Sequence, residues 1–337
     1  MYSLLPLGKL PVELLGQLIN IAPVTDDRVI FGPGIGLDCA VIDMGEHYQV
    51  IKSDPITFVT DEIGWYAVQV NANDIATTGA LPRWFTATVL LPEKSTTTEL
   101  VLQISRQLFD ACRDLGISFI GGHTEITYHL DRPIIAGTMI GEVQKDSLIT
   151  PRGASAGDAV LLCKGLAIEA TAILAREFPD RLLPVLGESG LQEAANYLYR
   201  PGISVLRDAR TAIAAGRVTA MHDPTEGGLG AALWELAEAC EHTVEVDSAA
   251  IPVSQITQKI CAVFDLNPLN AISSGALLIT TKNDDAQQVC SALQASGTPC
   301  TIIGKVQKGP VMVWDTSSGE RSLLPRPSRD DITKAYE

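Results

Sequence analysis

The sequence lacks several features that would place a protein in a membrane or outside the cell. No apolar run is long enough to span a bilayer, and the opening residues show no basic stretch followed by a long apolar segment and a small-residue cleavage site. The 7 cysteines form no CxxC pair, and their wide spacing favours reduced, buried thiols. These absences predict a cytoplasmic protein with no membrane partner.

Basic residues are also scarce. The sequence has 25 lysines and arginines against 40 aspartates and glutamates, which gives a net charge of −15. A chain this acidic repels polyanions, and no Lys/Arg stretch interleaved with aromatic residues offers a stacking platform. We therefore expect no nucleic-acid partner. Apolar residues make up 46% of the 337 residues, which is enough to form the cores of about two domains.

An ordinary phosphate-binding loop is absent too. The GxxxxGK[ST] motif does not occur, and the glycine-rich FGPGIG (31–36) lacks the GxGxxG spacing of a dinucleotide loop and precedes a predicted strand. Any bound nucleotide therefore needs a different cradle.

The sequence does contain four acidic segments that each place an aspartate beside small or turn-forming residues. They are GLDCAV (36–41), KSDPIT (52–57), NANDIATTGA (71–80) and MHDPTEGGL (221–229), with Asp38, Asp54, Asp74 and Asp223. A cluster of uncompensated carboxylates is costly unless a cation neutralises it, and oxygen ligands suit magnesium. If the fold brings these segments together, they predict a magnesium–nucleotide site. Taken alone, DPTEGG is also an ordinary helix entry.

A fifth segment, IGGHTEI (120–126), is a candidate phosphate contact. Gly121 and Gly122 would let backbone N–H groups approach a phosphate, and Thr124 supplies a hydroxyl. His123 is a candidate proton shuttle and Glu125 a candidate metal ligand or general base. The simpler alternatives are that His123 is a structural histidine and that Glu125 is a solvated loop carboxylate. His222 has the same two interpretations as His123, a proton shuttle or a structural histidine.

Hydrophobic spacing outlines a first domain at residues 1–150. The predicted elements are a short helix within 4–22, strands at 39–43 and 48–53 that form a hairpin, helices at 61–79 and 97–115, strands at 85–91 and 133–143, and a strand at 117–122 that runs into a glycine turn. The hairpin would carry Asp38 and Asp54 at strand ends. Asn71 and Asp74, three residues apart, would share one helix face.

A second domain is predicted at residues 151–312, after a linker-like stretch at 147–158. Strands at 159–164, 218–221, 276–280 and 301–306 alternate with helices at 167–178, 227–240 and 284–295. Residues 313–337 are predicted to be a tail, and 325–337 a weakly held segment.

In this order the motifs resemble the aminoimidazole ribonucleotide (AIR) synthetase (PurM)-like superfamily. Its members include selenophosphate synthetase, thiamine-monophosphate kinase and the hydrogenase-maturation carbamoyl dehydratase HypE. The resemblance spans residues 30–310. The second half is most similar to HypE, through HDPTEGGL, LNPLNAISSGALLI and IGKV, and the first half is also similar to thiamine-monophosphate kinase.

The resemblance implies an α/β (α+β) fold of two domains, with an N-terminal β-rich domain that pairs in a homodimer and a C-terminal α/β domain. It implies ATP and Mg2+ as cofactors in a cleft beside that interface. The implied metal ligands are Asp38, Asp54, Asp74 and Asp223, and the implied cofactor contacts are Asn71, Gly121, Gly122, Thr124 and Asp223. The implied reaction activates an amide, carboxyl or phosphate-acceptor oxygen of a small molecule by attack on the γ-phosphate.

Three departures keep alternatives open. Leu37 stands where members often carry a second aspartate, so one potential ligand is missing. No reactive cysteine precedes the first acidic motif, and this absence disfavours selenophosphate synthetase. The sequence ends at Glu337 without the terminal cysteine that carries the carbamoyl group in HypE, so the HypE reaction is not expected of this chain alone. The alternatives are a non-catalytic nucleotide-binding or assembly protein of the same fold, and a thiamine-monophosphate kinase-like small-molecule kinase.

Overall fold

The computed structural model describes residue 5, residues 8–57, residue 59 and residues 61–337, and these form two compact units. The N-terminal unit contains residues 24–32 and 38–148. The C-terminal unit contains residues 33–37 and 149–337 together with the described residues up to Pro23. The helix predicted within 4–22 is α1 (Val12–Asn20), and it packs in the C-terminal unit although the sequence suggested the first domain; residues 4, 6 and 7 of that range lie outside the described residues.

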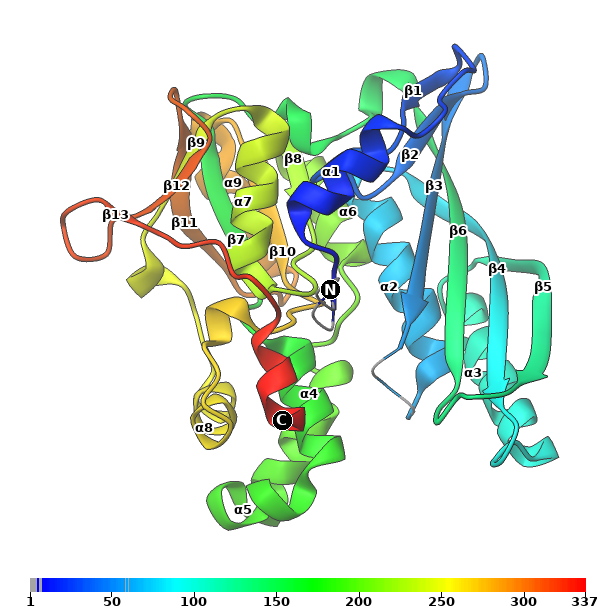
Figure 1. The fold of residues 1–337 in the computed structure, drawn as a ribbon. Coiled ribbons are helices and arrows are strands. Elements are labelled where there is room, and N and C mark those ends of the chain that lie inside the picture. Colours follow the sequence, from blue (N-terminus) through cyan, green and yellow to red (C-terminus); the bar gives the residue numbers. More distant parts are fainter. Residues whose placement is uncertain (1–4, 6–7, 58, 60) are drawn as a thin grey trace, which may run out of the picture. The chain divides into compact units, whose positions relative to one another are not determined.

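The N-terminal unit is a six-stranded sheet of order β1-β2-β3-β6-β4-β5 with two helices packed on it (Figure 1). Its strands are β1 (Val29–Phe31), β2 (Ala40–Asp43), β3 (His47–Ile56), β4 (Leu81–Pro92), β5 (Ser118–Thr127) and β6 (Ile134–Gln144). Helix α2 (Ile63–Thr77) packs on β3, β6 and β4, and α3 (Thr98–Asp114) packs on α2 and β5. The predicted elements of this unit are confirmed in type and order.

The predicted hairpin is the part of this sheet that positions two candidate ligands. Strands β2 and β3 pair antiparallel with Ala40 opposite Ile51. Asp38 precedes β2 and Asp54 lies near the end of β3, so both aspartates occupy the open end of the hairpin, away from its turn.

The predicted glycine turn after residue 122 is wrong, because β5 continues through it to Thr127. Gly121 and Gly122 have φ of +134° and +145°, a region that residues with a Cβ rarely adopt. A Cβ on Gly122 would lie 1.9 Å from the Ala87 carbonyl oxygen of β4. The glycines therefore allow a bulged strand to lie close to its neighbour, and the pairing register shifts between Phe85 and Thr86.

The C-terminal unit is a seven-stranded sheet of order β13-β12-β9-β11-β7-β10-β8, covered by helices (Figure 1). Its strands are β7 (Ala159–Cys163), β8 (Val218–His222), β9 (Thr243–Val246), β10 (Leu277–Thr281), β11 (Cys300–Gln307), β12 (Met312–Asp315) and β13 (Ser322–Leu323). Its further helices are α4 (Ile168–Glu177), α5 (Pro179–Ala195), α6 (Leu206–Ala215), α7 (Gly228–Cys240), α8 (Gln255–Val263) and α9 (Ala286–Ala295). None of the helices in the described part of the chain combines the length and apolar composition needed to cross a bilayer.

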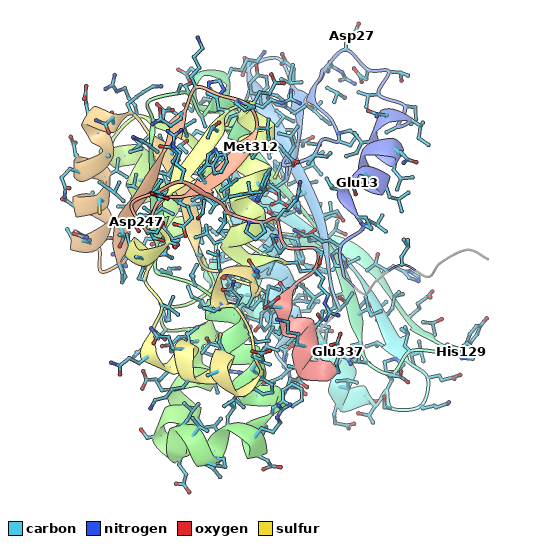
Figure 2. The ribbon with its side chains drawn as sticks, turned by 60° about the vertical axis from the view of Figure 1, so that its left-hand side comes forward. Glu13, Asp27, His129, Asp247, Met312 and Glu337 are labelled. Atoms are coloured by element: carbon cyan, nitrogen blue, oxygen red, sulfur yellow. The ribbon has the colours of Figure 1, made fainter. Side chains whose placement is uncertain are left out.

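Strand direction in this sheet brings certain loops together. Strands β7 and β8 both pair antiparallel with β10, so they run parallel to each other on either side of it. The loops that follow β7 and β8, and the segment that precedes β10, therefore meet at one edge of the sheet. Parallel pairing occurs between β9 and β12, and Figure 2 labels Asp247 just after β9 and Met312 at the start of β12.

Two segments that the sequence suggested were loosely held are packed in the C-terminal unit. In the predicted linker 147–158, Ala154 and Asp158 are buried, and a Cβ on Gly153 would meet the Thr219 carbonyl oxygen. The predicted tail contains β13 and a short 3-10 helix at Asp331–Tyr336, shown beside Glu337 in Figure 2. Ile332 and Ala335 of that helix are buried. Small and apolar side chains in both segments fill gaps between larger elements, which their local composition does not reveal.

Candidate functional site

Three of the four predicted metal ligands gather around one lysine of the N-terminal unit. The Lys52 Nζ atom lies 3.3 Å from an Asp74 carboxylate oxygen and 3.4 Å from one of Asp54, and Asp38 also acts on it electrostatically. These residues come from β3, α2 and the segment before β2. The Asp74 side chain is only 2% exposed and that of Lys52 13%. The fold therefore brings these aspartates together, as the sequence predicts.

The carboxylates of this cluster outnumber its one ammonium. Burial by itself lowers the pKa of the Lys52 ammonium, but the charges of Asp74, Asp54 and Asp38 outweigh it and raise that pKa well above its usual range. One ammonium faces three carboxylates, so negative charge remains. Carboxylate oxygens from separate segments are the donors that magnesium prefers. The residues present thus fit a magnesium ion.

Asn71 supports this cluster from helix α2. Its Oδ1 accepts a hydrogen bond from the Asp54 backbone N–H at 3.0 Å, and its Nδ2 donates to the carbonyl oxygens of Ala67 and Asp54. The side chain is fully buried. These bonds favour a positioning task for Asn71 over the direct nucleotide contact expected from the sequence.

The GGHTE segment lies elsewhere on the same sheet. Asp54 pairs with Gly137, Gly137 with Ala87 and Ala87 with Gly122, so Asp54 and Gly122 share one row across the sheet. They are three strand spacings apart, about 14 Å. Within one N-terminal unit, Gly121, Gly122 and Thr124 therefore do not reach the acidic cluster.

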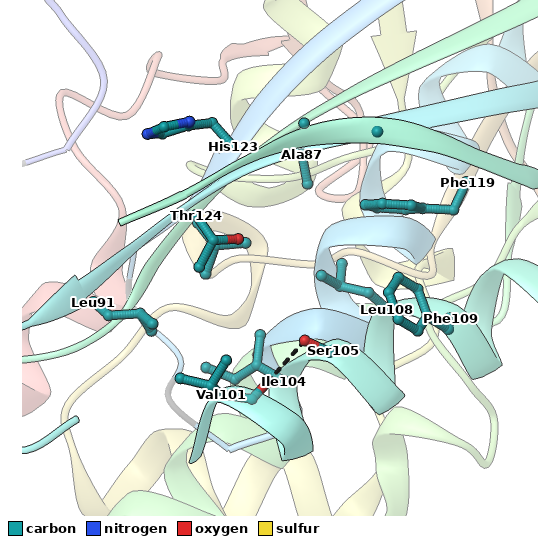
Figure 3. A pocket seen from close by; sticks show the side chains of 13 residues that line it. Ala87, Leu91, Val101, Ile104, Ser105, Leu108, Phe109, Phe119, His123 and Thr124 are labelled. Carbon is teal, nitrogen blue, oxygen red and sulfur yellow. Dashed lines mark hydrogen bonds between the residues drawn. The ribbon is translucent and has the colours of Figure 1, made fainter. Parts of the chain in front are cut away.

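The side chains of this segment point to different sides of β5 (Figure 3). Thr124 faces an apolar cavity of about 260 Å³ between β4, β5 and α3, lined by residues such as Leu91, Ile104 and Phe119. His123 points away from it, and its Nε2 lies 3.3 Å from a Glu125 carboxylate oxygen, with both side chains exposed. The described residues that line the cavity include no lysine or arginine, so its interior does not suit a phosphate.

Asp223 and His222 lie at the end of β8 in the C-terminal unit, and both are buried. The His222 Nε2 atom is 2.7 Å from a Glu235 carboxylate oxygen of α7. Lys9 contacts the same loop: its Nζ donates to the Thr225 hydroxyl at 3.3 Å, and its backbone N–H donates to Glu226. The loop after β8 is thus held by side chains from separate segments.

Glu169 is a residue at this sheet edge that the acidic motifs of the sequence do not include. It lies in the first turn of α4, is 4% exposed, and its Oε2 has no hydrogen-bond partner among the described residues. Burial raises the pKa of this carboxyl to about 7; hydrogen bonds from Ser274 oppose the rise, and the charges of Asp330 and Glu226 add to it. A lone acid within the apolar run LAIEATAILA (166–175) was the available sequence signal.

These features define an α+β protein of two units, with a cluster of aspartates around Lys52 on its N-terminal unit. The chain belongs to the AIR synthase related protein family. The model of the family's N-terminal domain matches residues 36–143, and that of its C-terminal domain matches residues 155–315.

Known relatives and solved structures support this assignment. A putative hydrogenase expression/formation protein of Methanocaldococcus jannaschii is 28% identical over 317 residues, 89% of this chain and 90% of the relative. Carbamoyl dehydratase HypE of Escherichia coli is 28% identical over 257 residues, 75% and 73% of the two chains. A structure of HypE in complex with ATP matches with a TM-score of 0.72 at 22% identity, covering 94% and 91%. A structure of AaThiL complexed with AMPPCP and TMP matches with a TM-score of 0.71 at 19% identity, covering 94% and 95%.

Replacing Lys52 with methionine tests the charge balance of the cluster. Without the ammonium, the free energy of unfolding should fall by about 3–5 kcal/mol in EDTA, because the carboxylates lose their buried partner. Millimolar Mg2+ should recover part of that loss. Urea denaturation measures both effects. Lys145→Met is the control, since Lys145 pairs with Asp43 at a more exposed site, and its change should stay within about 1 kcal/mol. An equal loss of unfolding free energy in the two variants, or no effect of Mg2+ on it, would contradict the interpretation that the cluster needs a cation.

The raised pKa of Glu169 predicts a pH-dependent stability. Because the folded state favours the protonated carboxyl, its contribution is present below the ordinary pKa of 4.5 and is lost as pH rises through about 7. Glu169→Gln should therefore gain stability relative to the unmodified protein between pH 5 and pH 8, by about 3 kcal/mol at most. Urea denaturation at the two pH values measures the gain. Glu177→Gln, at the exposed end of the same helix, should show no such pH dependence. If the stability difference between Glu169→Gln and the unmodified protein is the same at both pH values, the raised pKa of Glu169 is ruled out.

Proposed function

We propose that this protein is a Mg2+-dependent, ATP-binding enzyme that activates an oxygen atom of a small molecule by phosphoryl transfer. The observation that carries the proposal is that Asp38, Asp54 and Asp74 lie around Lys52. Three carboxylates beside one ammonium favour binding of a divalent cation. Family membership supports it, because the solved relatives include HypE in complex with ATP and AaThiL with AMPPCP.

The residues of this chain would divide the work as follows. Asp38, Asp54 and Asp74 would hold the metal, with Asp223 as a further ligand, and Asn71 would position Asp54 through the Asp54 backbone. A bound magnesium ion would neutralise the charge that develops on a transferred phosphoryl group. Lys52 would balance the aspartates when no metal is present.

The GGHTE segment would act at the free edge of β5. Edge strands present outward backbone N–H groups, and glycine lets a phosphate approach them closely. Gly121 and Gly122 would contribute in this way, and Thr124 would do so through its backbone, because its side chain faces the cavity. His123 and Glu125 are candidates for proton transfer beside them. Because these residues lie about 14 Å from the acidic cluster of their own unit, they would serve a site completed by a second copy of the chain.

A homodimer is therefore part of the proposal. The outer strand β5 exposes Ile126 and the adjoining Tyr128 at 61% and 71%, and an exposed apolar edge strand favours pairing with another chain. Sedimentation at micromolar concentration should show a dimer. Tyr128→Lys should shift the equilibrium toward monomer, since it places charge on that edge, whereas Tyr199→Lys in the C-terminal unit should not. A monomeric unmodified protein would remove the dimer and the shared site.

Calorimetric titration with a non-hydrolysable ATP analogue and Mg2+ tests the nucleotide site. The unmodified protein should bind, and Asp74→Asn should weaken binding by about 1–3 kcal/mol, because a charged ligand is lost. Asp223→Asn should have a similar effect. Asp43→Asn is the matched control: this carboxylate pairs with Lys145 at the hairpin turn and should leave affinity unchanged. No binding by the unmodified protein, or equal affinity in Asp74→Asn and Asp43→Asn, would overturn the assignment.

Turnover separates the proposal from its alternatives. Release of ADP with one member of a panel of amide, carboxylate and phosphate-ester metabolites would support an enzyme. Nucleotide binding without ADP release for the whole panel would favour a nucleotide-binding assembly protein. Phosphate transfer to thiamine monophosphate would identify a small-molecule kinase of the kind suggested by the AaThiL likeness.

A further inference from the structure

A single carboxylate of the segment 324–336, that of Asp330, binds the loop that follows Asp223. Asp330 Oδ2 accepts a hydrogen bond from the Gly227 backbone N–H at 2.6 Å, just before helix α7 begins. Its Oδ1 accepts from Ile272 at 3.2 Å and from Ile332 at 2.8 Å. One buried carboxylate therefore joins the loop after β8, the segment before β10 and the 3-10 helix Asp331–Tyr336.

The glycines at the start of α7 are explained by close packing of neighbouring segments. A Cβ on Gly228 would lie 2.6 Å from the carbonyl oxygens of Ala271 and Leu269, and one on Gly230 would lie 2.5 Å from the Asn270 side chain. Gly227 has φ of +83°, and a Cβ on it would lie 2.7 Å from the Ala231 side chain and 3.7 Å from that of Pro327. The double glycine of DPTEGG thus allows two neighbouring segments to close on the start of α7.

Further contacts fix segment 324–336 along α7. The Trp234 indole N–H donates to the Leu324 carbonyl oxygen at 3.0 Å, and Arg326 pairs with Glu238 at 2.6 Å. At the other end, Tyr336 packs edge-on against Phe178. Asp330 is consequently held in place from both sides, and it can hold the loop in turn.

From these contacts we propose that Asp330 is a positioning residue for the metal–nucleotide site, fixing the loop 223–227 and with it Asp223. The proposal rests on the proposed function, in which Asp223 is a ligand. In this role Asp330 would act through the loop and not on the bound groups. It acts on Gly227, four residues after Asp223, and it satisfies a backbone N–H at the start of α7 that would otherwise remain unpaired.

The first arm of the test measures the loop without any ligand. Asp330→Asn keeps the size of the side chain but turns one oxygen into an NH2 group, which cannot accept from the N–H groups that face it. Hydrogen exchange of the backbone amides at 223–230 in the full chain should become at least tenfold faster. Asp331→Asn is the matched control: Asp331 is equally buried and accepts from Asn267 at 2.8 Å, so its loss should speed exchange near 267 and not at 223–230.

The second arm measures affinity for an ATP analogue with and without Mg2+. Positioning through Asp223 predicts that Asp330→Asn weakens Mg2+-dependent binding by about 10- to 100-fold, the range for a residue that supports a metal ligand. Binding without Mg2+ should be unchanged, whereas a merely structural role would weaken both. Asp331→Asn should alter neither.

The outcomes separate the two proposals. Unchanged exchange at 223–230 in Asp330→Asn would overturn the positioning role whatever the protein binds. Faster exchange with unchanged Mg2+-dependent affinity, or an equal loss of affinity in Asp331→Asn, would also overturn it. An unmodified protein that binds no nucleotide would overturn the proposed function, and Asp330 would then be a structural brace only.

Discussion

The repulsion among carboxylates brought into one small volume is the constraint on which the N-terminal unit depends. Asp54 and Asp74 each lie within 3.4 Å of the Lys52 ammonium, and Asp74 is almost completely buried. Charges in such surroundings interact more strongly than in water, so the arrangement persists only with a cation present and with the backbone held firmly. The backbone is held by the hydrogen bonds between Asn71 and Asp54 and by the burial of α2 against the sheet.

The same physical problem recurs in the C-terminal unit with a different solution. Strand direction brings the loops after β7 and β8 to one edge, and with them Glu169 and Glu226, while Asp330 arrives from a distant part of the sequence. Among the described residues, no lysine forms an ion pair with Glu169 or Asp330 as Lys52 does with Asp54 and Asp74. Instead, burial raises the pKa of Asp330 to about 6 even though three backbone N–H groups oppose the rise. Backbone hydrogen bonds, and not an ion pair, keep this carboxylate in place.

Membership of the AIR synthase related family narrows the chemistry without naming the substrate. Related folds are found in proteins described as a carbamoyl dehydratase and in a structure that contains TMP, so the architecture is shared by different reactions.

Much of the fold follows from local sequence patterns. Short strand-like runs predicted β3 and β4, and a helical repeat of apolar residues predicted α3, because such patterns reflect burial within a single element. The acidic motifs likewise indicated Asp38, Asp54 and Asp74, because carboxylates beside turn residues need an explanation wherever they lie. The continuation of β5 through Gly121 and Gly122 was not foreseen, since a glycine pair indicates a turn unless a neighbouring strand approaches closely.

The sequence by itself determined most of the larger elements, their order and the residue types available for a cation site, but it did not indicate β1, β9, α5, α6 or α8. Only the tertiary structure decided that Lys52 lies among the aspartates, that Gly122 is three strands away from Asp54, and that Asp330 holds Gly227. The reason is that strand order, register and the docking of distant segments depend on contacts between residues far apart in the chain, which no local pattern encodes.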